Sequence, residues 1–527
     1  AGEREALVVD TEGLGQRVTI LGAAPGRLAD LEAVAGGVTY LRTPLQGVRS
    51  DTFAEAKPES HADLEYFDAR DGSTTMIFEG VVAYDVDRSG ARVAAVLNDG
   101  IATAELDGVK RTDIALDDAD LRVTIDEEWA QIFGEAWRLH RDFYWAPNMR
   151  GVDWGAMRRK YEALLPRIST RAELNDLIGQ MMGELRTSHS YIFGGDAFDT
   201  PVTEARTGLL GVDFRAESGG VRIVGILPDQ SWDPRGRSPL AAPHLGVEAG
   251  SFLRAIDGEP VTSTTSPYAL LRGRAGETVT ITIGSSDDDR ARGRDIIVET
   301  IPDESFLRTM RWEEANRAHV TAASEGRIGY VYVPDMDTDG LIAFGRQYYR
   351  QLDKDAMIID VRGNDGGYVS QMLLAHLLRT PIAAMQPREG LAFRYPERSF
   401  DGSYAVLIDQ NAGSDGDIFP AAFRRLGLGP LIGMRTWGGV VGIRGDKAFI
   451  DFGIATQPEF AWRDADGWSI ENVGVSPDIE VDDEPADALA GRSPQLDRAI
   501  SYLLERLEGD GRERKVPRDP PAYPGGR

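Results

Sequence analysis

Three continuous apolar stretches, each followed by a stretch with helical periodicity, limit the folds open to this chain more than any other feature. The apolar stretches lie at residues 328–333, 356–361 and 404–409, and the predicted helices at 341–352, 370–379 and 417–425. Strands buried on both faces read as unbroken apolar runs, and strands that alternate with helices form parallel sheets. We therefore expect residues 303–510 to form an α/β domain with a mostly parallel sheet, closed by a helix at 496–507.

The chain of 527 residues is too long for one hydrophobic core, and its patterning changes along its length. Residues 1–124 read as short strands separated by polar turns, the pattern of β-propeller blades. At about 40–45 residues per blade, this region holds two or three blades, too few to close a ring, so it is either the end of a propeller or a smaller structure. Residues 125–204 form a predicted helical domain, with amphipathic helices at 127–141, 154–165 and 171–185.

Two further regions flank the α/β domain. Residues 205–302 return to strands, expected at 209–214, 249–261 and 277–283, with a short helical stretch before the last. This order resembles a PDZ domain, in which a strand edge receives a peptide C-terminus. The acidic residues 287–289 are expected at a hairpin tip, and residues 511–527, rich in charge and then in Pro and Gly, as a disordered tail.

Composition excludes several classes of partner. The net charge of −27 would repel a nucleic-acid backbone. Arg, Asp or Gly interrupts every apolar run well before the ~20 residues of a membrane helix, so no membrane partner is expected. The chain has no cysteine, which excludes disulfides, thiolate zinc sites and a Cys nucleophile, and which fits a reducing cytoplasm.

No motif indicates a metal or a nucleotide cofactor. The chain contains no His-Glu-x-x-His segment, P-loop or dinucleotide fingerprint. Residues 335–340 match the start of an EF-hand calcium loop, but the twelfth position is Arg346 instead of a bidentate Glu. We therefore expect the aspartates of this segment to cap the following helix, and we expect no cofactor.

A serine between a buried strand and a helix is the first candidate for chemistry. Ser414 lies in residues 411–417, Asn-Ala-Gly-Ser-Asp-Gly-Asp, where the sheet's carboxyl edge gathers functional groups in α/β folds. The positive end of the helix dipole would stabilise an oxyanion formed there. A Gly-x-Ser-x-Gly elbow is absent, because position 412 is Ala, and taken alone Ser414 is more simply a helix cap.

Three more features suit a serine nucleophile. Residues 363–367, Gly-Asn-Asp-Gly-Gly, follow a predicted strand, and glycines there let backbone N–H groups point into an oxyanion site. His189, one of six histidines, could act as the base, because its pKa lies near working pH. Glu471 could stabilise the imidazolium. Each has an ordinary structural alternative: a strand-to-helix turn, a helix-end histidine and a surface carboxylate.

Taken together, these segments resemble the tail-specific, C-terminal processing serine peptidases. The resemblance covers residues 125–510 and includes Gly-Asn-Asp-Gly-Gly, Ala-Gly-Ser-Asp-Gly and Glu-Asn-x-Gly-Val-x-Pro-Asp at 471–478. It implies an α/β core of the ClpP/crotonase type. In the common branch of the family a lysine about twenty-five residues after the serine is the base, but Gly439 occupies that place here.

The tricorn branch of this family is the more similar one, because it pairs a Ser-His dipeptide of the helical domain with a serine and a glutamate of the core. This resemblance implies Ser414 as nucleophile, His189 as general base and then acid, and Ser188 as a bridge from Glu471 to the imidazole. It implies backbone N–H groups of Gly367 and Asp415 as the oxyanion hole. It also implies a homo-oligomer, a hexamer, that acts on peptides.

The sequence thus predicts a multidomain protein: partial propeller-like strands, helical domain, PDZ-like domain and α/β core. The leading hypothesis is a serine endopeptidase that degrades short or unfolded peptides through an acyl-enzyme, without a metal. A non-catalytic peptide-binding scaffold and an esterase or amidase for small substrates remain as alternatives.

Overall fold

The computed structural model describes residues 12–13, 23–44, 62–98, 100–116, 122–195, 205–218, 220–230, 233–284, 293–465 and 467–509. The chain divides into two compact units, Ala1–Val123 and Thr124–Arg527. The predicted hairpin tip at 287–289 and the predicted tail at 511–527 lie outside the described residues.

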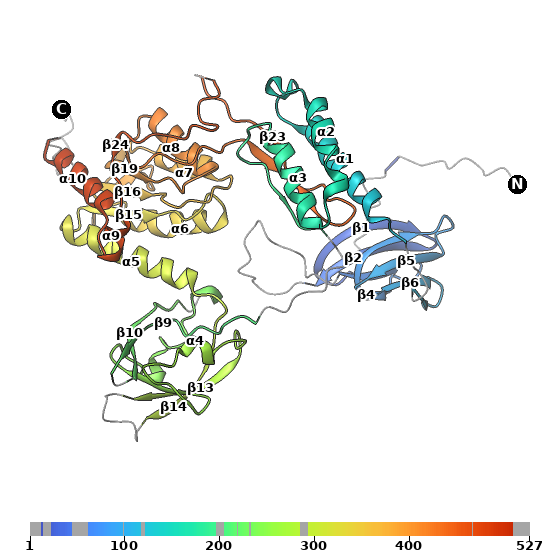
Figure 1. Cartoon of the computed structure of the whole chain (residues 1–527), viewed down its shortest axis with the longest axis horizontal. Coiled ribbons are helices and arrows are strands. Elements are labelled where there is room, and N and C mark those ends of the chain that lie inside the picture. Colours follow the sequence, from blue (N-terminus) through green and yellow to red (C-terminus); the bar gives the residue numbers. More distant parts are fainter. Residues whose placement is uncertain are drawn as a thin grey trace, which may run out of the picture. The chain divides into compact units, whose positions relative to one another are not determined.

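The described part of the first unit is one antiparallel sheet in which the strands pair in chain order, drawn in blue in Figure 1. Its strands are β1 (Gly26–Val34), β2 (Gly37–Pro44), β3 (Ala62–Asp68), β4 (Thr74–Val86), β5 (Arg92–Leu97), β6 (Gly100–Glu105) and β7 (Lys110–Ile114). Alternating side chains such as Val93, Ala95 and Leu97 are buried on one face. The sequence left open the end of a truncated propeller or a smaller structure, and the described strands form a single continuous sheet.

The predicted parallel sheet is confirmed in the second unit. Its order is β15-β16-β19-β20-β24, and every pair is parallel. The strands are β15 (Ile328–Tyr332), β16 (Ala356–Asp360), β19 (Ser403–Ile408), β20 (Leu431–Gly433) and β24 (Ile479–Glu480). All residues of β15 and β16, and all of β19 except its first, Ser403, are buried, as expected of strands covered on both faces.

Helices cover both faces of this sheet. Helices α6 (Thr338–Tyr348), α7 (Ser370–Leu377) and α8 (Asp415–Arg425) share one apolar cluster with the sheet, and α5 (Ser305–Ala323) and α10 (Pro494–Gly509) share another. Asp337 caps α6, as predicted for the aspartates that mimic a calcium loop. The hairpin β17 (Ala383–Met385) and β18 (Phe393–Tyr395) and the short α9 (Pro485–Leu489) complete this domain.

The helical domain contains α1 (Ile125–Phe143), α2 (Trp154–Glu162) and α3 (Arg171–Gly183), and the capping box of Thr170 and Glu173 is present. A stretch of the α/β domain is built into it. Strands β21 (Gly442–Arg444), β22 (Ile454–Ala455) and β23 (Gln457–Phe460) belong to this stretch, and β22 pairs with β8 (Ile192–Phe193). Figure 1 shows orange β23 beside the teal helix α1.

The PDZ-like domain is a sheet in the order β14-β13-β11-β10-β9, with β12 (Glu259–Pro260) paired to β11. Its strands are β9 (Val212–Glu217), β10 (Gly220–Ile226), β11 (Phe252–Ile256), β13 (Thr278–Gly284) and β14 (Arg294–Glu299), and α4 (Pro267–Leu270) is the short helix. Arg235 of this domain forms an ion pair with Asp339 of α6.

Candidate active site

Ser414 lies at the N-terminus of α8, directly after the turn that follows β19, and is partly exposed. Its backbone dihedrals are φ 59° and ψ −120°, a combination that residues with a Cβ rarely adopt. Strain of this kind persists only where the surrounding structure imposes it, and it gathers at functional sites. The dihedrals favour a nucleophile held in a fixed orientation over an ordinary helix cap, since caps adopt relaxed extended backbone.

The glycine segment at 363–367 packs directly against Ser414. A Cβ on Gly366 would lie 2.5 Å from Ser414 Cβ, and the N–H of Gly413 donates to the carbonyl of Asn364 at 3.0 Å. Glycine is therefore required at position 366 by close approach, and its φ of 87° also lies in the left-handed region. The two segments that the sequence placed far apart are thus brought together.

The two predicted oxyanion donors flank this contact. The bridge between Met336 and Gly367 uses the carbonyl of Gly366 and the N–H of Tyr368, so it leaves the Gly367 N–H outside the bridge. The N–H of Asp415 belongs to the first turn of α8, where amides lack a partner within the helix. In the described part of the chain, neither amide has a recorded hydrogen bond.

The side chain of Asp415 links the two segments that carry these donors, the start of α7 and the start of α8. Its carboxylate accepts the N–H of Ser370 at 2.9 Å and the Oγ–H of Ser370 at 2.5 Å. Ser370 begins α7, three residues after Gly367. Burial raises the pKa of Asp415, and the bonds from Ser370 oppose this shift. The contact fixes the spacing between the starts of α7 and α8.

Glu471 lies at the junction of the helical domain and the α/β domain. Its Oε1 accepts the N–H and the Oγ–H of Ser188, both at 2.9 Å. Its Oε2 accepts the N–H of Val440 at 2.9 Å and that of Val441 at 3.2 Å. With four donors the carboxylate is held in one orientation, and the predicted contact between Ser188 and Glu471 is present.

His189 is buried in the loop that follows α3, with its ring held by the α/β domain. Its Nδ1 lies 2.9 Å from the carbonyl oxygen of Val441. A carbonyl oxygen can only accept, so Nδ1 carries the proton and Nε2 keeps the lone pair that a general base needs. Burial lowers the pKa of His189, while the Val441 carbonyl and the charge of Glu471 raise it.

The resemblance implied that Ser188 bridges Glu471 to the imidazole. The hydrogen bonds found among the described residues are different. The hydroxyl of Ser188 is directed to Glu471, and Val441 takes the place at Nδ1 that the sequence assigned to Ser188. Glu471 is connected to the imidazole through the backbone at Val441, whose N–H it accepts.

Trp437 is a neighbour of both halves of the site. Its ring meets the ring of His189 edge-on, with 5.2 Å between the centroids. A Cβ on Gly413, the residue before Ser414, would lie 2.7 Å from Trp437 Cε3. His189 and the turn that carries Ser414 therefore share one side chain as a wall, although 225 positions separate them in the sequence.

Position 439, where the common branch of the family has its lysine, has no room for a side chain in this structure. A Cβ at this position would lie 2.7 Å from Ser188 Oγ and 2.3 Å from Trp437 Cζ3. The space is therefore filled by groups of the helical domain and by Trp437.

Sequence reasoning missed Val441, Trp437 and Asp417. Val441 binds the His189 ring through its backbone carbonyl, and every residue type has such a carbonyl, so the sequence gives no sign of this contact. Trp437 was visible beside Gly439, and Asp417 stands within the segment of Ser414, so proximity to the candidate nucleophile was the only signal for them.

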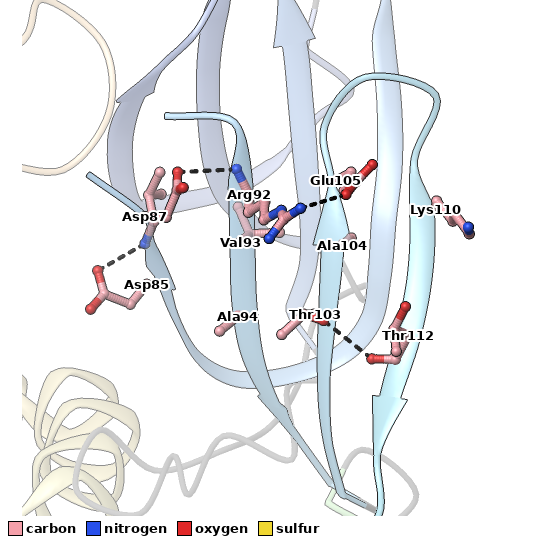
Figure 2. A pocket seen from close by; sticks show the side chains of 11 residues that line it. Asp85, Asp87, Arg92, Val93, Ala94, Thr103, Ala104, Glu105, Lys110 and Thr112 are labelled. Atoms are coloured by element: carbon pink, nitrogen blue, oxygen red, sulfur yellow. Dashed lines mark hydrogen bonds and ion pairs between the residues drawn. The ribbon is translucent and has the colours of Figure 1, made fainter. Parts of the chain in front are cut away.

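A hollow of about 520 Å³ lies elsewhere, on strands β4 to β7 of the first unit (Figure 2). Two of its charged side chains form an ion pair, in which Arg92 donates to Glu105 at 2.9 Å, and Asp87 accepts the backbone N–H of Arg92 at 3.2 Å. None of the residues that line it is a candidate from the sequence. We therefore assign the chemistry to the surroundings of Ser414. No helix in the described ranges is both long and apolar enough to span a membrane.

Comparison with protein families gives three matches along the second unit. The tricorn protease C1 domain matches residues 125–183, the tricorn protease PDZ domain matches 208–303, and peptidase family S41 matches 327–481. The matches follow the order of the helical, PDZ-like and α/β domains.

Individual relatives agree with these matches. The chain is 37% identical to tricorn protease homolog 1 of Streptomyces coelicolor, over 95% of this chain and 47% of the relative. It is 34% identical to the tricorn protease of Thermoplasma acidophilum, over 95% and 46%. A crystal structure of the tricorn protease aligns with a TM-score of 0.82 and 33% identity, over 96% of this chain and 49% of that one. The chain spans about half the length of these relatives.

Proposed function

The chain belongs to the tricorn protease family of S41 serine peptidases, and on that premise we propose that it is a serine endopeptidase that degrades short or unfolded peptides. The observation that carries the proposal is the strained backbone of Ser414 at the head of α8, packed against Gly366. A scaffold without catalysis would have no use for this strain, because peptide binding by a PDZ-like domain does not involve Ser414.

In the proposed reaction, Oγ of Ser414 attacks the peptide carbonyl carbon, and its proton passes to Nε2 of His189. The N–H groups of Gly367 and Asp415 stabilise the oxyanion. The imidazolium then protonates the leaving amine, which leaves Ser414 as an ester. A water gives a proton to Nε2 and attacks the ester carbonyl, and Nε2 then returns that proton to Oγ of Ser414 as the C–O bond breaks, which releases the peptide acid and restores the serine.

Ser188 and Glu471 act on the base in this scheme. The charge of Glu471 stabilises the imidazolium, and its bonds to Ser188, Val440 and Val441 hold the two segments that contact His189. The proposal assigns no role to a metal or a cofactor.

A fluorophosphonate probe tests the nucleophile. We expect the probe to label Ser414 in the folded protein and Ser414→Ala to abolish both labelling and peptide hydrolysis. Ser501→Ala is the control, because Ser501 is exposed on α10 and its hydroxyl bonds within that helix, so labelling of Ser414 and hydrolysis should both be retained. Stoichiometric peptide binding without hydrolysis or labelling would favour the scaffold.

Peptide length separates the endopeptidase from the small-substrate esterase or amidase. We expect kcat/KM to rise with the number of residues on both sides of the cleaved bond, since remote contacts contribute to the transition state. A kcat/KM independent of peptide length would support the esterase or amidase.

We also propose that the protein assembles as a homo-oligomer, a hexamer by resemblance to tricorn, located in the cytoplasm. Exposed apolar side chains on the hairpin of β17 and β18 support assembly: Ile382 is 77% exposed and Leu391 is 91% exposed. Such clusters mark protein interfaces. The absence of cysteine supports the location. Light scattering after size exclusion measures the state, and a monomer at micromolar concentration would contradict the assembly.

A further inference from the structure

A buried carboxylate lies one helical turn beyond the nucleophile and has no role in the proposed reaction. Asp417 is fully buried in the first turn of α8, three residues after Ser414. A fully buried aspartate is rare unless it is paired or saturated with hydrogen bonds. Asp417 has no cationic partner recorded among the described residues, so its hydrogen bonds must account for its burial.

The carboxylate of Asp417 accepts three hydrogen bonds from one short segment, residues 436–441, which we call the base strip. Its Oδ1 accepts the hydroxyl of Thr436 and, at 2.8 Å, the N–H of Gly438. Its Oδ2 accepts the N–H of Gly439 at 3.1 Å. The hydroxyl of Thr436 in turn accepts the N–H of Val475 at 2.8 Å.

The other end of the base strip holds the imidazole. Val441 accepts the Nδ1 proton of His189, and Glu471 accepts the N–H groups of Val440 and Val441. Two carboxylates therefore clamp the strip. Asp417 fixes it to the helix of the nucleophile, and Glu471 fixes it to the loop that carries the base.

We propose that Asp417 is a positioning residue that sets the placement of His189 relative to Ser414 through the base strip. The inference rests on the proposed function, because it assigns His189 as the base for Ser414. The backbone N–H of Asp417 donates to the Ser414 carbonyl at 2.9 Å, and its side chain connects the first turn of the serine's helix to the backbone that orients the imidazole. Since Asp417 and Ser414 share one helical turn, a shift of the strip against Asp417 is a shift of His189 against Ser414.

The first test is Asp417→Asn, which keeps the size of the side chain but turns one acceptor into a donor. That NH₂ group would face a strip donor, such as the N–H of Gly439. We expect kcat on a peptide substrate to fall by about tenfold to a hundredfold, since a base that is misplaced loses part of its contribution of about 10²–10⁴. KM should change by less than about threefold, because the substrate contacts are retained.

A matched pair at Thr436 separates the hydrogen bond from packing. Thr436→Val keeps the shape and removes the hydroxyl that joins Asp417 to Val475, so it should lower kcat as Asp417→Asn does. Thr436→Ser keeps the hydroxyl and should restore most of the rate. Equal loss in both variants would show that packing matters and would overturn the proposal.

Exchange of the His189 Nδ1 proton, measured by NMR, tests the proposal independently of peptide hydrolysis. In protein labelled with ¹⁵N-histidine, the Nδ1 proton of His189 should exchange slowly with water, because it is buried and bonded to Val441. We expect fast exchange in Asp417→Asn and Thr436→Val, and slow exchange in Thr436→Ser. His189→Gln identifies the resonance.

Asp360→Asn is the control for lost stability. Asp360 is as fully buried as Asp417, but it binds Arg362 and Tyr330 under the opposite face of the sheet. It should lower the melting temperature while the Nδ1 proton stays protected. If Asp417→Asn also leaves Nδ1 exchange and kcat unchanged, the proposal is wrong. If the wild type hydrolyses no peptide but Asp417→Asn exposes Nδ1, the proposed function fails and the positioning role stands.

Discussion

At the scale of single residues, Gly439 is a position beside the site where the structure leaves no room for a side chain. A Cβ there would lie 2.7 Å from Ser188 Oγ and against the rigid ring of Trp437. We predict that Gly439→Ala displaces Ser188 from Glu471 and lowers kcat by about tenfold to a hundredfold, the usual cost of misplacing a catalytic group by about 1 Å. Steady-state peptide hydrolysis measures the effect.

Gly445→Ala is the matched control for this substitution. Gly445 follows the same segment of the chain, and a Cβ there would meet only Ile454, at an ordinary 3.9 Å. It should retain wild-type activity. Full activity in Gly439→Ala would show that the hydroxyl of Ser188 is dispensable.

The acid limb of the pH–rate profile depends on His189. The base must be neutral, and burial lowers the pKa of His189 from its usual value of 6.5. The acid limb of kcat/KM should therefore have its midpoint below pH 6.5, and activity should persist at mildly acidic pH. Glu471 raises this pKa by its charge, so Glu471→Gln should move the midpoint to still lower pH as well as reduce kcat. A midpoint at or above 6.5 would contradict the burial of the ring.

At the scale of elements, the buried ion pair between Arg171 and Asp451 joins α3 to residues 442–460, the excursion of the α/β domain that is built into the helical domain. Removal of one partner leaves the other charge buried, which costs about 3–5 kcal/mol. We predict that Asp451→Asn lowers the free energy of unfolding by about this amount and reduces activity in parallel. Chemical denaturation followed by activity and circular dichroism measures both.

The exposed pair of Arg158 and Glu162 on α2 is the control. Glu162→Gln should cost at most about 1 kcal/mol, because water screens an exposed pair. A similar cost for the two substitutions would mean that Arg171 finds another partner when Asp451 is neutral.

The sequence was most informative about elements with local signals. The apolar strands at 356–361 and 404–409 became β16 and β19, and the capping box of Thr170 was found where predicted. The excursion at 442–460 was missed, because β22 pairs with β8 across the length of the chain and no local pattern encodes such a partner. Helix α5 was missed because its apolar side chains do not follow one face.

The sequence named several residues that the structure brings together, but it did not give the hydrogen bonds that connect them. Ser414 with Gly366, and Ser188 with Glu471, meet as the sequence implied. The bond from His189 to the Val441 carbonyl depends on backbone position, which residue types do not report. The oxyanion roles of Gly367 and Asp415 remain predictions.

At the scale of the whole molecule, His140 makes stability depend on pH. It is completely buried in α1, and burial lowers its pKa to about 4 from 6.5. Above pH 6.5 the histidine is neutral in both states. As pH falls from 6.5 to about 4, only the unfolded chain binds the proton, so the free energy of unfolding falls by about 3 kcal/mol.

His140→Phe should remove this part of the pH dependence, because phenylalanine does not titrate. Melting temperatures between pH 7 and 4 measure it, with the exposed His244→Gln as control. An unchanged slope in His140→Phe would assign the acid sensitivity to other groups.

The excursion of the α/β domain into the helical domain also governs when activity can arise during synthesis. His189 precedes its partner Val441 by 252 residues, and Ser188 precedes Glu471 by 283. A ribosome adds roughly 5–20 residues per second, so roughly 15–60 seconds pass before the histidine meets its partners. Through that interval His189 lacks the carbonyl that orients its ring, and Ser188 lacks its carboxylate partner. The proposed peptidase activity can therefore arise only after residues 441 and 471 have been synthesised, which delays it without a removable propeptide.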